Sequence, residues 1–275
     1  ARELGAVTTY SATQAANAMQ ALSRSGMTAN EIMGATGPAL MLAGASGESM
    51  TLATESLAAT LAQFNLDAAE SERVTDTFSI ALRSSLFDLG SLRQAMKYAG
   101  TVGAAFNMTL EETVASVALF RDLGLEGSLA GTQLRMAMAS AAKVSKTGEE
   151  VLAKYGMTLH DINPETNTFA DILQKVGDAG MGASDAIEVF GRRTGANVAN
   201  LAQSFADGTT KYNTMLSEMN SGTGTTEEMY TDMIDTVQGQ FTIARSAFEE
   251  LLLTIFDTYS GPLKELLEQV SETIN

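Results

Sequence analysis

The 275-residue sequence contains no cysteine and no tryptophan, a single histidine and three prolines, and only 6% of its residues are aromatic. The lack of cysteine excludes disulfides, thiolate nucleophiles and thiolate metal ligands. One imidazole, that of His160, leaves little with which to build a zinc site. No run of about 18 apolar residues occurs, so we expect no single helix of this sequence to span a bilayer. We therefore predict no cofactor and no metal.

Positive charge is also scarce, because 17 lysines and arginines face 33 acidic residues and the net charge is −16. Such a balance opposes association with the phosphates of nucleic acids and with anionic lipid headgroups. We expect no direct nucleic-acid partner. The only basic doublet is Arg192-Arg193, which is interpreted either as a helix-end or ion-pair feature or as a contact for an acidic partner.

Candidate catalytic groups are equally sparse. His160 stands at the edge of a stretch containing Pro164 and two asparagines, where an exposed or cap-bonding imidazole is the simpler interpretation. Paired acids such as Glu111-Glu112 are adjacent in sequence and point in different directions on a helix, as solvated faces do. The sequence is therefore not expected to encode an enzyme.

What the sequence does contain is alanine, 24 glycines and 15 methionines within a 45% hydrophobic composition. Alanine contributes little apolar area, so a core of this kind depends on many small contacts. Apolar residues recur at helical spacing through most of the chain. The predicted fold is all-α, an irregular succession of short helical hairpins followed by a long C-terminal helix with a heptad seam.

A recurring joint organises these helices. Asn107 can take the left-handed conformation that ends one helix, Met108 can pack across the junction, and Thr109 with Glu112 can form a capping box that starts the next. The same pattern begins near residues 26, 65, 107 and 156, about the spacing of a two-helix unit. The predicted caps are Thr28 with Glu31, Asp67 with Glu70, Thr109 with Glu112, and Thr158 with Asp161.

The joints divide residues 1–220 into a compact helical body of about five helix-turn-helix units, followed by a linker over residues 221–226. Residues 227–275 are predicted to form a long amphipathic helix broken at Gly261-Pro262. Inside the body, Pro38 predicts either a kink or a fresh helix start. The stretch from residue 160 to 168 is predicted to be a loop or a small strand pair.

Eight residues of the last segment follow alternating spacings of four and three. They are Tyr230, Ile234, Val237, Phe241, Ala244, Phe248, Leu251 and Ile255. This heptad seam is typical of a helix that seeks a partner helix, and we assign self-association or docking to these residues. A single amphipathic helix that folds back onto its own domain would show the same pattern, and the sequence leaves both open.

Four segments in order carry a resemblance to a known family. Residues 89–100, 108–112 and 127–135, together with the Phe-Gly-Arg-Arg element at 190–193, resemble the core region of phage tail tape measure proteins. The resemblance implies a structural protein of the virion tail, made in the host cytoplasm, several copies of which lie in the tail tube. Such copies help to set tail length, contact tail-tip or tail-tube proteins and leave ahead of the DNA.

The resemblance also implies a homo-oligomer, with a trimer favoured, and the start at Ala1 leads us to expect a fragment of a longer chain. Two other functions stay open: a non-enzymatic helical scaffold or adaptor, and an envelope-inserting helical protein, for which residues 251–256 are the only support. Membrane contact is expected only of residues 227–275 or of regions outside this chain.

Overall fold

The computed structural model describes residues 10–206 and 211–236, together with the individual residues Ala244, Arg245, Phe248, Leu251, Thr254 and Ile255. Within these residues the regular structure is helical throughout, as the sequence predicts. The elements are α2 (Ala12–Ser23), α3 (Ala29–Ser46), α4 (Met50–Gln63), η1 (Ala68–Glu70), α5 (Ser71–Ser84), α6 (Leu89–Ala105), α7 (Leu110–Asp122), α8 (Ser128–Ala142), α9 (Lys146–Lys154), α10 (Leu159–Ile162), α11 (Phe169–Asp178), α12 (Ala183–Phe190), α13 (Gly195–Ala206), α14 (Lys211–Ser221) and α15 (Thr225–Ile234).

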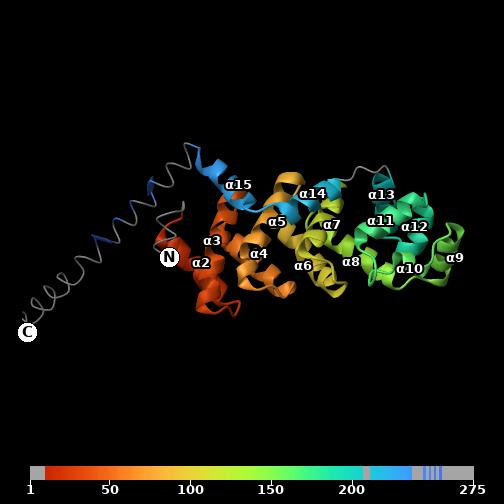
Figure 1. Ribbon diagram of the computed structural model, residues 1–275, viewed down its shortest axis with the longest axis horizontal. Helices are drawn as coiled ribbons and strands as arrows, with labels where there is room; N and C mark the ends of the chain where they lie inside the picture. Colours follow the sequence, from red (N-terminus) through yellow and green to blue (C-terminus); the bar gives the residue numbers. More distant parts are fainter. Residues whose placement is uncertain are drawn as a thin grey trace, which may run out of the picture.

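The helices follow one another along an elongated body and then return. Figure 1 shows the chain running from α2 at one end, through α4 to α8, to α9 and α12 at the other end. The chain then turns back, so that α14 packs on α5 and α7 while α15 packs on α3 and α5. Helix α15 therefore contacts α5, which lies about 150 residues earlier in the sequence.

Helix ends in this body share one backbone device. Asn65 and Asn107 are the two described residues other than glycine with positive φ, at 50° and 56°. The amide that follows each of them donates to a carbonyl five residues back, from Leu66 to Leu61 at 2.9 Å and from Met108 to Gly103 at 2.9 Å. This bond satisfies a carbonyl that the helix end would otherwise leave unpaired.

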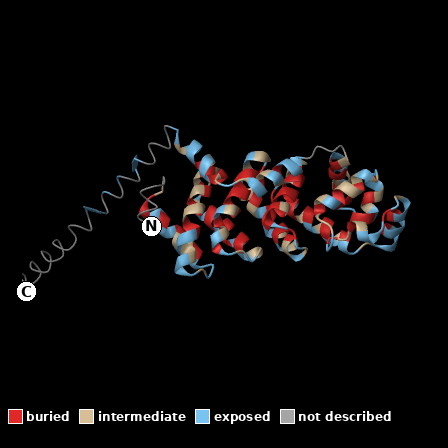
Figure 2. Ribbon diagram, viewed as in Figure 1, coloured by how far each residue is buried: buried red, intermediate tan, exposed pale blue. Residues whose placement is uncertain are grey.

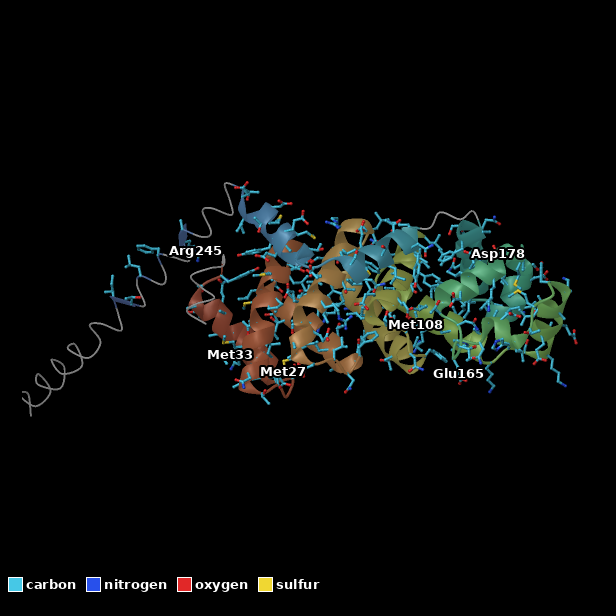
Figure 3. All side chains as sticks on the ribbon, viewed as in Figure 1. Met27, Met33, Met108, Glu165, Asp178 and Arg245 are labelled. Atoms are coloured by element: carbon cyan, nitrogen blue, oxygen red, sulfur yellow. The ribbon has the colours of Figure 1, made fainter. Side chains whose placement is uncertain are left out.

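The same device closes four more helices with glycine in place of asparagine. The left-handed residues are Gly47, Gly124, Gly156 and Gly180. An apolar residue follows three of these four glycines, and a capping residue or a second glycine then precedes the next helix. The joint is thus used more often than at the four sites predicted from the sequence. Met27 and Met108, which follow two predicted joints, lie at separate places along the body (Figure 3).

The core runs along the body as one continuous cluster in which alanines alternate with larger aliphatic and aromatic side chains, and buried residues line the inner faces of successive helices (Figure 2). Two glycines allow the closest helix approaches. A Cβ at Gly131 in α8 would overlap the Ala95 carbonyl of α6, and one at Gly177 in α11 would overlap the Ala202 carbonyl of α13. These contacts bring backbone against backbone, which only glycine permits.

Two local expectations are resolved by the structure. Pro38 lies within α3 and starts no new helix, because α2, α4, α5 and α15 all pack on α3 and hold it together despite the missing N–H. The strand pair offered for residues 160–168 is wrong, since α10 and a turn occupy this stretch. Gly100 and Gly103 lie inside α6 and accommodate the side chains of Gln63 and Thr113.

Candidate functional site

Three of the predicted caps are reciprocal hydrogen-bonded boxes in the structure. The Thr28 amide donates to Glu31 Oε2 at 2.6 Å, and the Thr109 amide donates to Glu112 Oε2 at 2.8 Å. Thr158 donates to Asp161 Oδ2 from its amide, at 2.8 Å. The backbone hydrogen bond from Thr28 lowers the pKa of Glu31, and that from Thr158 lowers the pKa of Asp161.

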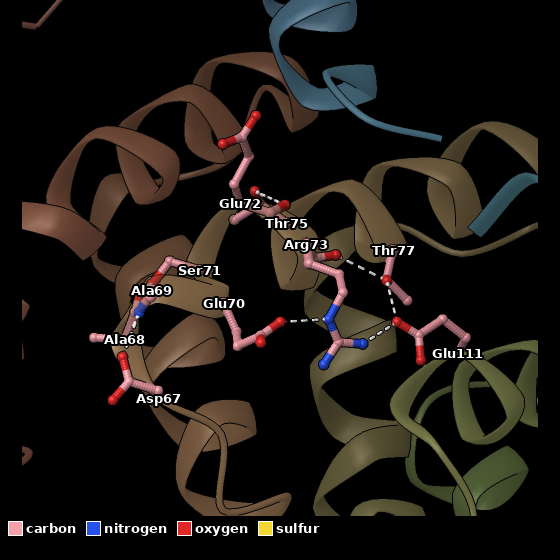
Figure 4. Close-up of polar contacts among 10 residues, drawn as sticks. All are labelled: Asp67, Ala68, Ala69, Glu70, Ser71, Glu72, Arg73, Thr75, Thr77 and Glu111. Atoms are coloured by element: carbon pink, nitrogen blue, oxygen red, sulfur yellow. Dashed lines mark hydrogen bonds and ion pairs between the residues drawn. The ribbon is translucent and has the colours of Figure 1, made fainter. Parts of the chain in front are cut away.

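The fourth cap has a different arrangement. Asp67 caps η1 by accepting from the Ala69 amide at 2.8 Å. Glu70 does not reach back to Asp67 but accepts from Arg73 Nε at 2.6 Å (Figure 4). A 3₁₀ turn lies between Asp67 and α5. The Glu70 side chain therefore points along α5 and not back toward Asp67.

Arg73 links α5 to α7, two helices that are not consecutive in the chain. Its guanidinium donates hydrogen bonds to Glu70, three residues earlier in the chain, and to Glu111 at the start of α7 (Figure 4). Glu111 is only 4% exposed, so its carboxylate depends on this partner and on the Thr77 hydroxyl, 3.5 Å away. A buried carboxylate without a partner is strongly unfavourable, and Arg73 therefore fixes α7 against α5.

The most extended polar site receives the returning helix α15. Asp76 of α5, which is 2% exposed, accepts from the Gly224 amide at 2.8 Å and from the Thr226 amide at 2.7 Å. Ser79 lies one turn further along α5, with its hydroxyl 2.9 Å from that of Thr226. Asp76 thus acts as the N-cap of a helix that begins almost 150 residues later, and its charge is favourable at that helix end.

Two further contacts hold α14 and α15. Arg83 Nη2 lies 3.3 Å from Glu218 Oε2 of α14, and Arg83 Nη1 lies 3.9 Å from Glu228 Oε2 of α15. Both ion pairs are at the exposed surface. The ring of Tyr230 covers Gly44 of α3 so closely that a Cβ at Gly44 would overlap it.

Tyr230 also lies close to Tyr10 at the start of the described chain. Burial, with a smaller contribution from Tyr230, raises the pKa of Tyr10 to about 12. The sequence assigned Tyr230 to the heptad seam, and the structure buries its side chain against the body.

The other seam residues differ in their surroundings. Ile234 is half-buried, and Val237 and Phe241 lie outside the described residues. The remaining four are exposed: Ala244, Phe248, Leu251 and Ile255. Self-association through these residues stays a prediction, and the predicted linker includes Thr225 and Thr226, which are buried at the start of α15.

The described ranges show no concentrated chemistry. No group of three or more His, Asp and Glu side chains suited to a metal occurs among these residues, and none of their helices is long and apolar enough to cross a membrane. His160 lines an open depression of about 560 Å³ beside Lys143 and Glu165. Arg192 and Arg193 are exposed in the turn between α12 and α13.

These observations describe an all-α body whose polar side chains cap helices and join them. Comparison with known families identifies it further: the chain belongs to the phage-related minor tail protein family, whose pattern matches residues 1–192. It is thus a structural protein of the phage tail.

Two relatives cover the whole chain. The tape measure protein of Pneumococcus phage Dp-1 is 27% identical over 278 aligned residues, which are 99% of this chain and 24% of that protein. The probable tape measure protein of Escherichia phage P2 is 24% identical over 282, which are 100% of this chain and 34% of that protein. The chain therefore spans a quarter to a third of the length of these relatives. No solved structure matches.

Proposed function

We propose that this chain is a segment of a tape measure protein, occupying the tail tube or tip and contributing to tail length. The observation that carries the proposal is the alignment of the entire chain with two proteins of that name from phages of different hosts. Tail-tube and tail-tip proteins are the partners this role requires. Catalysis is not part of the role, and the polar side chains described above cap helices and join them.

Release ahead of the DNA belongs to the same proposal. Alanine and methionine make up a large share of the buried core, beside leucine, valine and phenylalanine, and the chain has no disulfide. Each alanine buries little apolar area. A negative net charge of −16 also opposes binding to the DNA that follows. A chain of this kind can be unfolded and drawn through a narrow tube at a modest free-energy cost.

We also propose that copies associate through the heptad seam, with a trimer favoured. Phe248 and Leu251 leave 60% and 54% of their surface exposed, a large apolar area for residues three positions apart on one chain. An exposed apolar stripe of this spacing is stabilised when a second helix covers it. The second copy supplies the same stripe.

Two experiments test these proposals separately. Electron microscopy of phage whose full-length protein lacks residues 10–206 tests the tail role, and tails of altered length or yield are expected. Tails unchanged in length and number would contradict the role.

Mass measurement of the 275-residue chain in solution tests self-association. We expect an oligomer that is lost in the double variant Phe248→Asp, Leu251→Asp and retained in Leu129→Asp, a control at an apolar side chain that is 47% exposed outside the seam. A monomer at all concentrations would contradict association through the seam.

A further inference from the structure

The helix α15 is attached to the body differently from the helices around it. Only three of its ten residues are buried: Thr225, Thr226 and Tyr230. Its first turn rests on Asp76 and Ser79 of α5, two polar side chains, and its middle rests on Gly44 of α3. These contacts of α15 are thus made with hydrogen-bonding side chains of α5 and a glycine of α3, whereas Val74 and Phe78 of α5 are buried in the main hydrophobic core.

The connection between α14 and α15 has three residues, 222–224, and two of them are glycines. Gly224 has a φ of 79°, which few other residues adopt, and Gly222 lies against Ile80 of α5. A short glycine-containing segment between two helices is where a hinge can absorb backbone rotation. Rotation there moves α15 without requiring any other described helix to move.

We propose that α15 is a releasable strap, which separates from α3 and α5 about the hinge at residues 221–224 while the rest of the body stays folded. Release exposes the Asp76 carboxylate and the Ser79 hydroxyl, which water solvates readily, and Tyr230 is the one large side chain of α15 that leaves a buried position. It also frees everything after residue 224 to change direction relative to the body. The strap is a property of this chain and does not depend on the tape-measure role.

Two glycines of α3 provide a matched test. Gly44→Ala places a methyl group where the Tyr230 ring lies, whereas Gly34→Ala in the same helix meets nothing within 4 Å. Alanine strengthens the helix at both positions, so neither change weakens α3. In hydrogen exchange measured by mass spectrometry, Gly44→Ala is expected to speed exchange of residues 225–234 by about tenfold or more, with α5 and α7 unchanged. Gly34→Ala is expected to leave residues 225–234 at the rate of the unmodified chain.

A second variant addresses the other anchor. Asp76→Asn removes the negative charge of the side chain that accepts hydrogen bonds from the Gly224 and Thr226 amides. The hydrogen-exchange rate of these two residues is again expected to rise by about tenfold. Circular dichroism melting, together with exchange in α11 and α13 at the far end of the body, reports whether Asp76→Asn still folds. If Asp76→Asn does not fold, the two glycine variants still decide the outcome.

The absence of native cysteine permits a reversible lock. Ser79 and Thr226 have hydroxyl oxygens 2.9 Å apart, so the double variant Ser79→Cys, Thr226→Cys brings two thiols together, which oxidation can join in a disulfide. When this variant is oxidised, residues 225–234 should exchange as slowly as α5, and reduction should restore the faster exchange.

Three results would overturn the proposal. They are exchange of α15 no faster than that of α5 in the unmodified chain, equal effects of Gly44→Ala and Gly34→Ala on residues 225–234, and disulfide-linked dimers in place of an intramolecular bond. Dimers would show that the α15 seated on each body belongs to another copy.

Discussion

Gly131 of α8 lies directly against the carbonyl of Ala95 in α6, with no room for a side chain between them. Gly177 and Ala202 repeat the relationship between α11 and α13. In both places the contact is glycine against a main-chain oxygen, which cannot move aside as a flexible side chain can. These two contacts set the distance between the helices of two closely packed pairs.

Gly131→Ala is therefore expected to destabilise the body although alanine favours helix formation. The methyl group has to push α6 and α8 apart, and overpacking of this kind costs about 1–3 kcal/mol. Urea unfolding followed by circular dichroism measures the change. Gly34→Ala is the control, because its methyl group meets open space and should stabilise the chain by up to about 1 kcal/mol. Equal stability of the two variants would contradict the close approach.

Asn107 provides a test of the joint itself. Its φ of 56° is unfavourable for an alanine, so Asn107→Ala is expected to lower the free energy of unfolding by about 1 kcal/mol. Asn107→Gly removes the steric penalty but raises the conformational entropy of the unfolded chain, so its stability should stay close to that of the unmodified chain. Chemical unfolding of both variants gives the comparison, and a glycine variant as unstable as the alanine variant would contradict this explanation.

Arg73 and Arg93 allow a buried and an exposed ion pair to be compared. Arg73→Met leaves the carboxylate of Glu111, which is 4% exposed, without its cation, and we expect a loss on the order of 2 kcal/mol. Arg93→Met removes a partner from Glu55 at the surface, where the expected loss is below about 1 kcal/mol. Denaturant unfolding of the two variants tests the difference. A loss for Arg93→Met as large as that for Arg73→Met would contradict the assigned role of Glu111 burial.

The cap at Asp88 predicts a dependence of stability on pH. The hydrogen bond from the Ser91 backbone amide holds the pKa of Asp88 below its ordinary value of 3.8. A depressed folded-state pKa means that the stabilisation is fully present above about pH 4 and is lost as pH falls through the folded-state value. Asp88→Asn still caps but does not titrate there, so its stability difference from the unmodified chain should change as the pH falls from 5 to 2. Guanidinium unfolding across this range measures it, and a constant difference would contradict the cap's ionised state.

Local chemistry made much of this fold predictable. Asn107, Met108, Thr109 and Glu112 are contiguous or nearly so, and their bonds form within one turn whatever the rest of the chain does. The joints at Gly47, Gly124 and Gly180 were not among the four predicted, although a glycine that ends an apolar helical pattern signals a helix end at each of them. The strand pair expected near residue 160 failed because proline and asparagine mark a turn without fixing what the turn connects.

The sequence by itself determined the all-helical class and the helix boundaries at its capped joints, because these depend on residues within a few positions of one another. The resemblance to tail proteins was carried by four segments taken in order. Only the tertiary structure decided that Asp76 caps α15, that Arg73 neutralises Glu111, and that Tyr230 lies on Gly44. Each of these contacts joins residues at least 38 positions apart, and no periodicity specifies which of many acids, amides and glycines will meet. The path of the chain, which runs out to α9 and returns through α14, brings them together.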